Sequence, residues 1–357
     1  MKLCTSTTHL FLIVAVSLFI GTLAHAQAPQ TRPPRPVVIK PKESKEKEKE
    51  KIPTFPIGAQ LPPGVAFGDG TTSERLIAVD AKVSIQLCVT QGTVKVNGWG
   101  RSELRAFVSE GSKFGFRVLE KSPKDGRPVF ISLVGLRQLP GGNVTTTDCI
   151  SGDDIELDVP ENAAVSLKGR ETSTSVDSIR KVLISNIGGD INVNNVAQGV
   201  RASTYQGDVT VLNSAGVMVL ESSSGNIIAH EVSPAEVGDV FKAKTNSGAI
   251  SLQKLGFRLA EVNSLSGTVL FTGELASGGS FSFTTTNGAI RLALPGNASC
   301  RVTATYGFGS FNSELPIKTL TEDVRSGPAK TINAIMGGGD ATLRLTTNSG
   351  AILIKKL

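Results

Sequence analysis

Few residues in this chain are suited to acid–base, nucleophilic or metal chemistry. Among 357 residues there are three histidines, four cysteines, one tryptophan and two tyrosines. Two histidines, His9 and His25, lie within the first 26 residues, so that His230 is the one that remains after them. Ser-His-Asp and Cys-His arrangements and histidine-based metal sites therefore have no support, and we expect neither a catalytic residue nor a cofactor nor a metal ligand.

Long apolar runs are scarce as well. The run from Leu10 to Ile20 follows Lys2 and precedes Ala24-His25-Ala26, which puts small residues at both specificity positions of a cleavage site. This run is shorter than the roughly 20 residues that a membrane helix needs. The pattern predicts a signal peptide over residues 1–26 and no membrane span after its cleavage. We expect an exported protein of the periplasm, the cell surface or the extracellular space.

Residues 27–56 hold many prolines and the run KESKEKEKEK, with little apolar surface to bury. This composition predicts a disordered linker, either a stalk for the folded part or a solvated tail. Most of the net charge of +6 lies in this linker, so that the remainder is close to neutral. We therefore expect no nucleic acid partner, since that needs basic residues clustered on a folded face.

What the sequence does have is a repeat. A turn with Gly, usually after Ser or Asn, returns about every 20 residues, and its clearest copies span 181–357. The turn residues are Gly92, Gly189, Gly207, Gly225, Gly248, Gly267, Gly288 and Gly350. Around each of them the positions seven and five before and two and four after are apolar, as in Met218, Leu220, Ile227 and Ala229 around Gly225. Gly307 is a poorer copy, because its plus-two residue is Gly309.

Offsets of two on both sides of the glycine are the period of β-strands, not of helices. Each unit is then strand, tight turn, strand, and a unit of this size buries its apolar face only by stacking on its neighbours. The sequence predicts an all-β parallel β-solenoid with coils of about 20 residues. An antiparallel sandwich of short hairpins is the alternative, but it does not explain why the same offsets stay apolar in every unit.

The part from 57 to 180 is less regular. Phe114 to Lys121 and Pro128 to Leu136 flank SPKDG, which predicts an antiparallel hairpin excursion near residues 100–150. The solenoid pattern returns near residue 150, with Asp153 at the position of the turn glycine, and 168–178 reads as one degenerate coil.

The same register bears on the cysteines. Cys88 lies four residues before Gly92 and Cys149 four before Asp153, so both point outward at one position of the coil. If their coils are adjacent, the separation suits a disulfide, and export removes the reducing environment. A bridge and two free surface thiols both remain open. Cys300 is expected to face inward as a small apolar side chain.

The motifs SSSGNI, TNSGAI, TTNGAIRLALP, GTVKVNGWGRSEL and the closing block GGGDATLRLTTNSGAILIKKL resemble a family. They look like the bacterial "putative adhesin" family of Gly-punctuated β-strand repeats, a domain of unknown function related to the GIN-type adhesin heads. The resemblance covers residues 76 to 357, with 100–180 as its irregular part. It implies a right-handed β-solenoid in an envelope or surface protein and carries no catalytic residues over.

Two hypotheses for function follow. One is a noncatalytic exported protein whose surface serves adhesion or acts as a scaffold, with an envelope protein or a surface glycan as partner. The other is a β-helix polysaccharide lyase or hydrolase, which needs carboxylates beside a basic residue on an outer face. The densest acids, Asp154, Glu156 and Asp158, alternate with inward apolar residues, as on an ordinary solvated strand. The first hypothesis is favoured.

The end of the chain suggests one more interaction. Ala351 to Leu357 forms the last strand, with Lys355 and Lys356 on what would be an exposed edge. Ser313 to Gly339 could fold back as a partial cap. If it does not, edge-to-edge pairing of two chains would give a homodimer.

Overall fold

The computed structural model describes residues 62–71, 73–324 and 329–357, and every regular element among them is a β-strand. The predicted signal peptide 1–26 and linker 27–56 lie outside the described residues. In this part of the chain no helix is long and apolar enough to cross a membrane.

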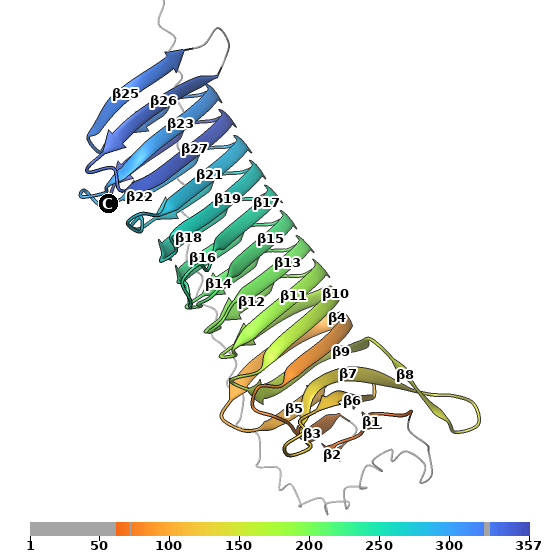
Figure 1. The fold of residues 1–357 in the computed structure, drawn as a ribbon. Coiled ribbons are helices and arrows are strands. Elements are labelled where there is room, and N and C mark those ends of the chain that lie inside the picture. Colours follow the sequence, from red (N-terminus) through yellow and green to blue (C-terminus); the bar gives the residue numbers. More distant parts are fainter. Residues whose placement is uncertain (1–61, 72, 325–328) are drawn as a thin grey trace, which may run out of the picture. The chain divides into compact units, whose positions relative to one another are not determined.

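The regular coils form two parallel ladders, which we call the first and the second ladder (Figure 1). The first ladder contains β11 (Lys181–Gly188), β13 (Val200–Gln206), β15 (Met218–Ser224), β17 (Phe241–Ser247), β19 (Leu259–Ser266) and β21 (Ser280–Asn287). The second contains β12 (Ile191–Asn194), β14 (Val209–Leu212), β16 (Ile227–Val232), β18 (Ile250–Leu255), β20 (Val269–Thr272) and β22 (Ile290–Leu294). The prediction of an all-β parallel solenoid is confirmed, and the sandwich alternative is wrong.

The core lies between the ladders, and it is made of the positions that the repeat predicts. Ile191, Val209, Ile227 and Ile250 pair one after another in unshifted register. Every residue seven and five before and two and four after the turn glycines from Gly189 to Gly288 is at most 2% exposed. Burial of one such Val, Ile, Leu or Phe side chain contributes about 1.5–3 kcal/mol. Stacking of equivalent side chains therefore accounts for the stability of the rod.

The turn glycines stack directly on one another. Gly225 has a φ of 156°, and a Cβ there would lie 2.0 Å from the carbonyl oxygen of Gly207. Gly248 repeats this, with its Cβ position 2.1 Å from the oxygen of Gly225. Real Cβ contacts are never this short, so the corners at Gly225 and Gly248 admit only glycine.

Beneath the glycines runs a second column that we call the hydroxyl ladder. Three residues before each of the glycines from Gly207 to Gly288, and before Gly350, a buried Ser or Thr donates its hydroxyl hydrogen to the glycine carbonyl of the neighbouring coil. Ser222 reaches Gly207 at 2.9 Å, and Thr245 reaches Gly225 at 3.0 Å. The other members are Thr204, Ser264, Thr285 and Thr347. These bonds satisfy carbonyls that would otherwise be buried without a donor.

The last coil does not stand at the end of the stack. β27 (Ala341–Ser349) pairs with β21 on one side and with β23 (Cys300–Phe308) on the other. β28 (Ile352–Lys356) likewise lies between β22 and β24 (Phe311–Ser313). The expected exposed edge at Ala351 to Leu357 is therefore wrong, because the final strand has a neighbour on both sides.

The outermost coil also corrects the assignment of its turn glycine. A Cβ on Gly309 would lie 1.9 Å from the oxygen of Gly350, and Val302 pairs with Leu343. Gly309, not Gly307, therefore continues the glycine column, which explains why the frame around Gly307 fits poorly.

The segment after β24 does fold back. β25 (Ile317–Val324) and β26 (Lys330–Met336) form an antiparallel hairpin, and β26 pairs antiparallel with β23. Among the described strands β25 pairs only with β26, so it is the edge of the first ladder at this end. A register shift between Thr319 and Thr321 breaks its regularity, which discourages strand addition. Edge-to-edge pairing into a homodimer remains a prediction, and the strand at which we now expect it is β25.

The other end of the stack has the same kind of insertion. β4 (Ser84–Trp99) and β10 (Ala164–Asp177) each run across both ladders and pair in parallel. β10 is the degenerate coil, with Thr172 opposite Gly92. The far side of β4 pairs with β7 (Pro128–Gln138) in the first ladder and with β9 (Ile150–Pro160) in the second. The first coil in sequence therefore also lies inside the stack.

Beyond β4 the two ladders separate. β6 (Phe114–Lys121) forms the predicted hairpin with β7, which is confirmed, and β8 (Val144–Thr147) pairs with the end of β7. β1 (Val65–Ala66) adds to β6, while β5 (Glu103–Val108), β3 (Glu74–Ala78) and β2 (Asp69–Gly70) extend the second ladder from β9.

Candidate binding surface

The lone histidine of the described part is engaged in surface contacts. His230 lies on β16, and its Nδ1 is 2.9 Å from Oε1 of Gln253 on the paired strand β18. Its Nε2 is 3.7 Å from Glu231, whose carboxylate also accepts from Lys254. The hydrogen bond from Lys254 lowers the pKa of Glu231. No group of three or more His, Cys, Asp or Glu among the described residues could hold a metal ion.

The acidic strand β9 is matched by basic residues. Asp158 accepts from Nη1 of Arg105 at 2.5 Å, and Glu74 accepts from Nε of the same guanidinium at 2.6 Å. The bonds to Glu74 and Asp158 raise the pKa of Arg105. Glu156 lies 3.8 Å from Lys95. These acids are the solvated, charge-matched face that their alternation predicts.

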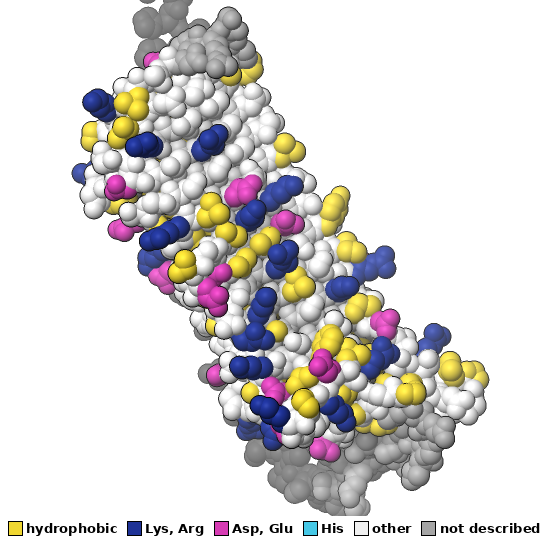
Figure 2. All heavy atoms as spheres, viewed as in Figure 1, with side chains coloured by type: hydrophobic (Ala, Val, Ile, Leu, Met, Phe, Trp, Pro, Cys, Tyr) yellow, Lys and Arg dark blue, Asp and Glu magenta, His cyan; other side chains and the backbone are white. Residues whose placement is uncertain are grey.

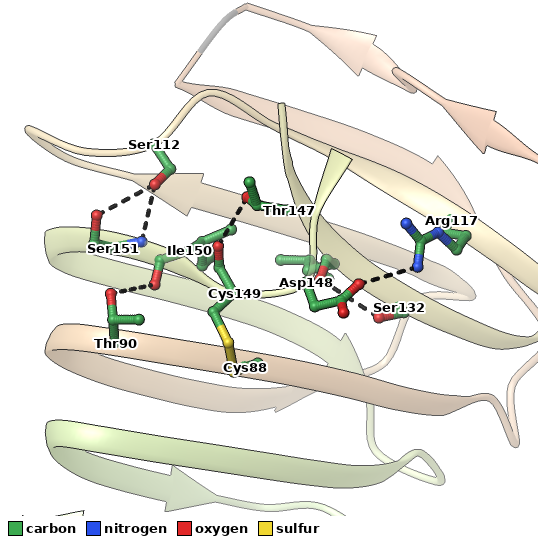
Figure 3. The surroundings of a disulfide bond; sticks show 11 residues. Cys88, Thr90, Ser112, Arg117, Ser132, Thr147, Asp148, Cys149, Ile150 and Ser151 are labelled. Atoms are coloured by element: carbon green, nitrogen blue, oxygen red, sulfur yellow. Dashed lines mark hydrogen bonds and ion pairs between the residues drawn. A yellow bond between two sulfur atoms is a disulfide. The ribbon is translucent and has the colours of Figure 1, made fainter. Parts of the chain in front are cut away.

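Cys88 and Cys149 are joined by a disulfide with a Cα–Cα distance of 4.4 Å (Figure 3). Cys88 lies on β4 and Cys149 immediately precedes β9, at the point where the two ladders separate. The hydroxyl of Thr90 donates to the carbonyl of Ile150 beside the bridge. The bridge therefore fastens the start of β9 to β4. Cys300 is a free thiol and fully buried, as predicted, and burial raises its pKa to about 11.

A hollow of about 340 Å³ lies beside this bridge. Arg117 of the hairpin donates from Nη2 to Thr146 at 2.6 Å and lies 3.4 Å from Asp148, as Figure 3 shows for the latter. Lys168 of β10 completes the charged lining. The lining holds one carboxylate, so the pair that glycoside hydrolysis requires is not present there.

The first ladder presents a second hollow, of about 270 Å³, across β11, β13, β15 and β17. Tyr205, which is 61% exposed, contributes the one aromatic ring of its lining. We call the side chains around this ring the Tyr205 site: Ser203, Glu221, Ser223, Lys244 and Asn246. Asn186, Thr204 and Ser222 complete the lining from the hydroxyl-ladder position of their coils.

Trp99 and Tyr306, the other aromatic side chains that carry a polar atom, are less accessible to a ligand. Trp99 donates from Nε1 to the carbonyl of Glu103 at 2.8 Å, and Arg101 covers its ring. Tyr306 is only 7% exposed. Of these aromatic groups Tyr205 alone is open to a ligand. Its position two residues before Gly207 is an outward one, so the repeat itself indicates that this ring is exposed.

The first ladder as a whole shows no block of one charge. In Figure 2 apolar, basic and acidic side chains intermix over the middle of the stack. Toward the end that carries β21, β27 and β23 white surface predominates, in agreement with the outward Thr284, Thr346 and Thr305 on successive strands. Arg344 interrupts the neighbouring row, so this is not a uniform threonine lattice.

Comparison with known proteins identifies a family. A family model described as Toastrack DUF4097 matches residues 151–355, which is more than half of the chain. The expected type of family, a domain of unknown function, is thus found, but the match does not extend to the GIN-type heads. No curated protein sequence is significantly similar to the chain.

Among solved structures, one described as a "putative cell adhesion protein from Clostridium sporogenes ATCC 15579" is similar to the chain at a TM-score of 0.23 and 13% sequence identity. The alignment covers 80% of this chain and 99% of that one. A similarity this distant says nothing about what either protein binds.

Proposed function

Since the chain belongs to the Toastrack DUF4097 family, we propose that it is a noncatalytic exported protein whose first ladder binds a partner, as an adhesin-like surface or a scaffold. A stack of coils is a rigid support on which outward side chains keep regular spacing over a long distance. Fold alone assigns no function, so the proposal depends on the site that the fold carries.

The observation that carries the proposal is the Tyr205 site. The side chains of Tyr205, Glu221, Lys244 and Asn246 make no hydrogen bond or ion pair with any described residue, although they line one hollow. Polar groups gathered around an exposed tyrosine are typical of binding sites. On the neighbouring pair of strands, by contrast, Lys242 and Glu261 form an ion pair at 3.2 Å.

Export is supported by the N-terminal sequence and by the bridge. Residues 1–26 have the order of a signal peptide, and Cys88–Cys149 is a bond that persists outside the reducing cytosol. The hydrolase hypothesis has no comparable support, because Asp158 and Glu156 of β9 are paired with Arg105 and Lys95.

The test measures binding of the labelled mature protein to envelope material of the source organism. Two variants, one on each ladder, carry a bulky arginine at an outward position. Ser223→Arg places a long cation in the hollow, and Thr210→Arg makes the same change at an outward position of the second ladder. We expect binding by wild type and by Thr210→Arg, and at least about a tenfold loss for Ser223→Arg. Equal binding by both variants, or no binding by wild type, would contradict the proposal.

A further inference from the structure

The Tyr205 site combines an aromatic face with a hydrogen-bond acceptor, the Glu221 carboxylate, and a donor, the Lys244 ammonium. Glu221 of β15 and Lys244 of β17 stand at directly paired positions, on strands about 4.8 Å apart. No ion pair links them, whereas the next pair of opposite charges, Lys242 and Glu261, is closed. The Glu221 carboxylate and the Lys244 ammonium are therefore neighbours, and each is available for a hydrogen bond to a ligand.

A sugar hydroxyl suits such a pair, because it donates one hydrogen bond and accepts others. Neighbouring hydroxyls on one ring can donate to the Glu221 carboxylate and accept from the Lys244 ammonium. Asn246 and Ser223, in the same outward column as Tyr205, add groups that do both. The carboxylate and the ammonium cancel, so the site has no net charge and favours an uncharged ligand.

The ring of Tyr205 supplies the apolar part of the contact. The face of an aromatic ring carries partial negative charge, and the C–H bonds on one face of a pyranose are polarised positive by the adjacent oxygens. A volume of about 270 Å³ is smaller than the pockets that hold drug-sized molecules. The hollow therefore fits one ring of a polymer whose remainder runs along the ladder.

We infer that the Tyr205 site binds one residue of a neutral glycan, with the sugar ring on Tyr205 and its hydroxyls between Glu221 and Lys244. This inference rests on the proposed function and names the chemical class of its partner. A protein partner would bury the exposed aliphatic side chains Leu183 and Ile187 as well, and it is the alternative that the experiment separates.

The full mature chain would be titrated with mannotetraose and cellotetraose as neutral probes, whose 1,4-linked residues keep a 2,3-diol, and applied to envelope material treated with periodate or with protease. Periodate cleaves vicinal diols and leaves most of the protein backbone intact. We expect binding of at least one probe, loss of envelope binding after periodate, and retention after protease. Tyr205→Ala should weaken binding about tenfold or more, and Tyr205→Phe should stay within about threefold.

Leu265→Ala is the matched control. Leu265 occupies the same position of its coil as Tyr205, is 54% exposed and lies outside the hollow, so its removal should leave binding unchanged. Envelope binding that survives periodate and is lost after protease would overturn the glycan site and leave the proposed function standing. Absence of binding to untreated envelope would overturn both. Equal affinities of wild type and Tyr205→Ala for a bound probe would place the sugar elsewhere.

Discussion

Gly248→Ala tests the stacking of the coils most directly. The backbone of Gly248 has a φ of 152°, which L residues rarely adopt. The new Cβ would lie 2.1 Å from the carbonyl oxygen of Gly225, and that atom belongs to backbone that cannot rotate away. The coils would have to separate locally by roughly 1 Å to restore an ordinary contact.

The magnitude follows from three contributions. The positive φ costs about 1–2 kcal/mol for a residue with a Cβ. Separation of the coils weakens the flanking bonds from Gly225 N to Ser247 O and from Ile227 N to Ala249 O, each worth about 0.5–1.5 kcal/mol. Together these give a loss of about 2–5 kcal/mol in the free energy of unfolding, which is large beside a typical total of about 5–15 kcal/mol.

The assay is urea unfolding followed by far-ultraviolet circular dichroism, with two companion variants. Gly288→Ala isolates the steric part, because Gly288 has no left-handed φ but its Cβ would lie 2.0 Å from the oxygen of Gly267. Gly100→Ala is the control, with no heavy atom within 4 Å of its Cβ. We expect a large loss for Gly248→Ala, an intermediate one for Gly288→Ala and less than about 1 kcal/mol for Gly100→Ala. Equal midpoints for all three would refute stacking of the glycine corners.

Three further predictions concern bonds inside the stack. Reduction of Cys88–Cys149 should lower the free energy of unfolding by about 4 kcal/mol, since the bridge closes a loop of 61 residues. The intact mass should rise by two hydrogens on reduction, and an unchanged mass would show that both cysteines are free thiols. Thr245→Val should cost about 1–3 kcal/mol by leaving the carbonyl of Gly225 without its hydroxyl donor, whereas Thr286→Val on the outer face should cost little; similar midpoints in urea would count against the hydroxyl ladder. Because burial raises the pKa of Cys300 from 9.0 to about 11, the unfolded chain releases this proton first, so stability is full below about pH 9 and falls as the pH rises toward 11. Cys300→Ala should remove that part of the alkaline loss in pH-dependent unfolding, and an identical profile would show that the thiol does not contribute.

Much of the architecture could be predicted because it depends on local alternation. Whether Ile227 or Ala229 faces inward is settled by its distance from Gly225, since side chains alternate along a strand whatever its neighbours are. The same counting placed Cys88 and Cys149 at one position of the coil, and the two are bonded in the structure. The hydroxyl ladder has an equally regular sequence signal, a Ser or Thr three residues before most of the glycines. A polar side chain is not expected to be buried without a hydrogen-bond partner, and the partner here, a carbonyl of the neighbouring coil, is known only from the structure.

The Tyr205 site could not be assembled in the same way. Its members come from different coils, and their availability depends on which neighbours leave them unpaired. Glu221 with Lys244 and Glu261 with Lys242 look equivalent in sequence, yet only the second pair closes. Side-chain distances of this kind exist only in the assembled stack.

By itself, the sequence determined which residues face the core, where the corners lie and that the units must stack, because these follow from a two-residue period around glycine. Only the tertiary structure decided the order of the stack, in which β4 lies between β9 and β10, and β27 between β21 and β23. The physical reason is that every coil presents the same apolar frame and the same glycine corner to its neighbours. Local pattern therefore cannot distinguish one partner from another, and the choice is made by long-range pairing of the terminal coils.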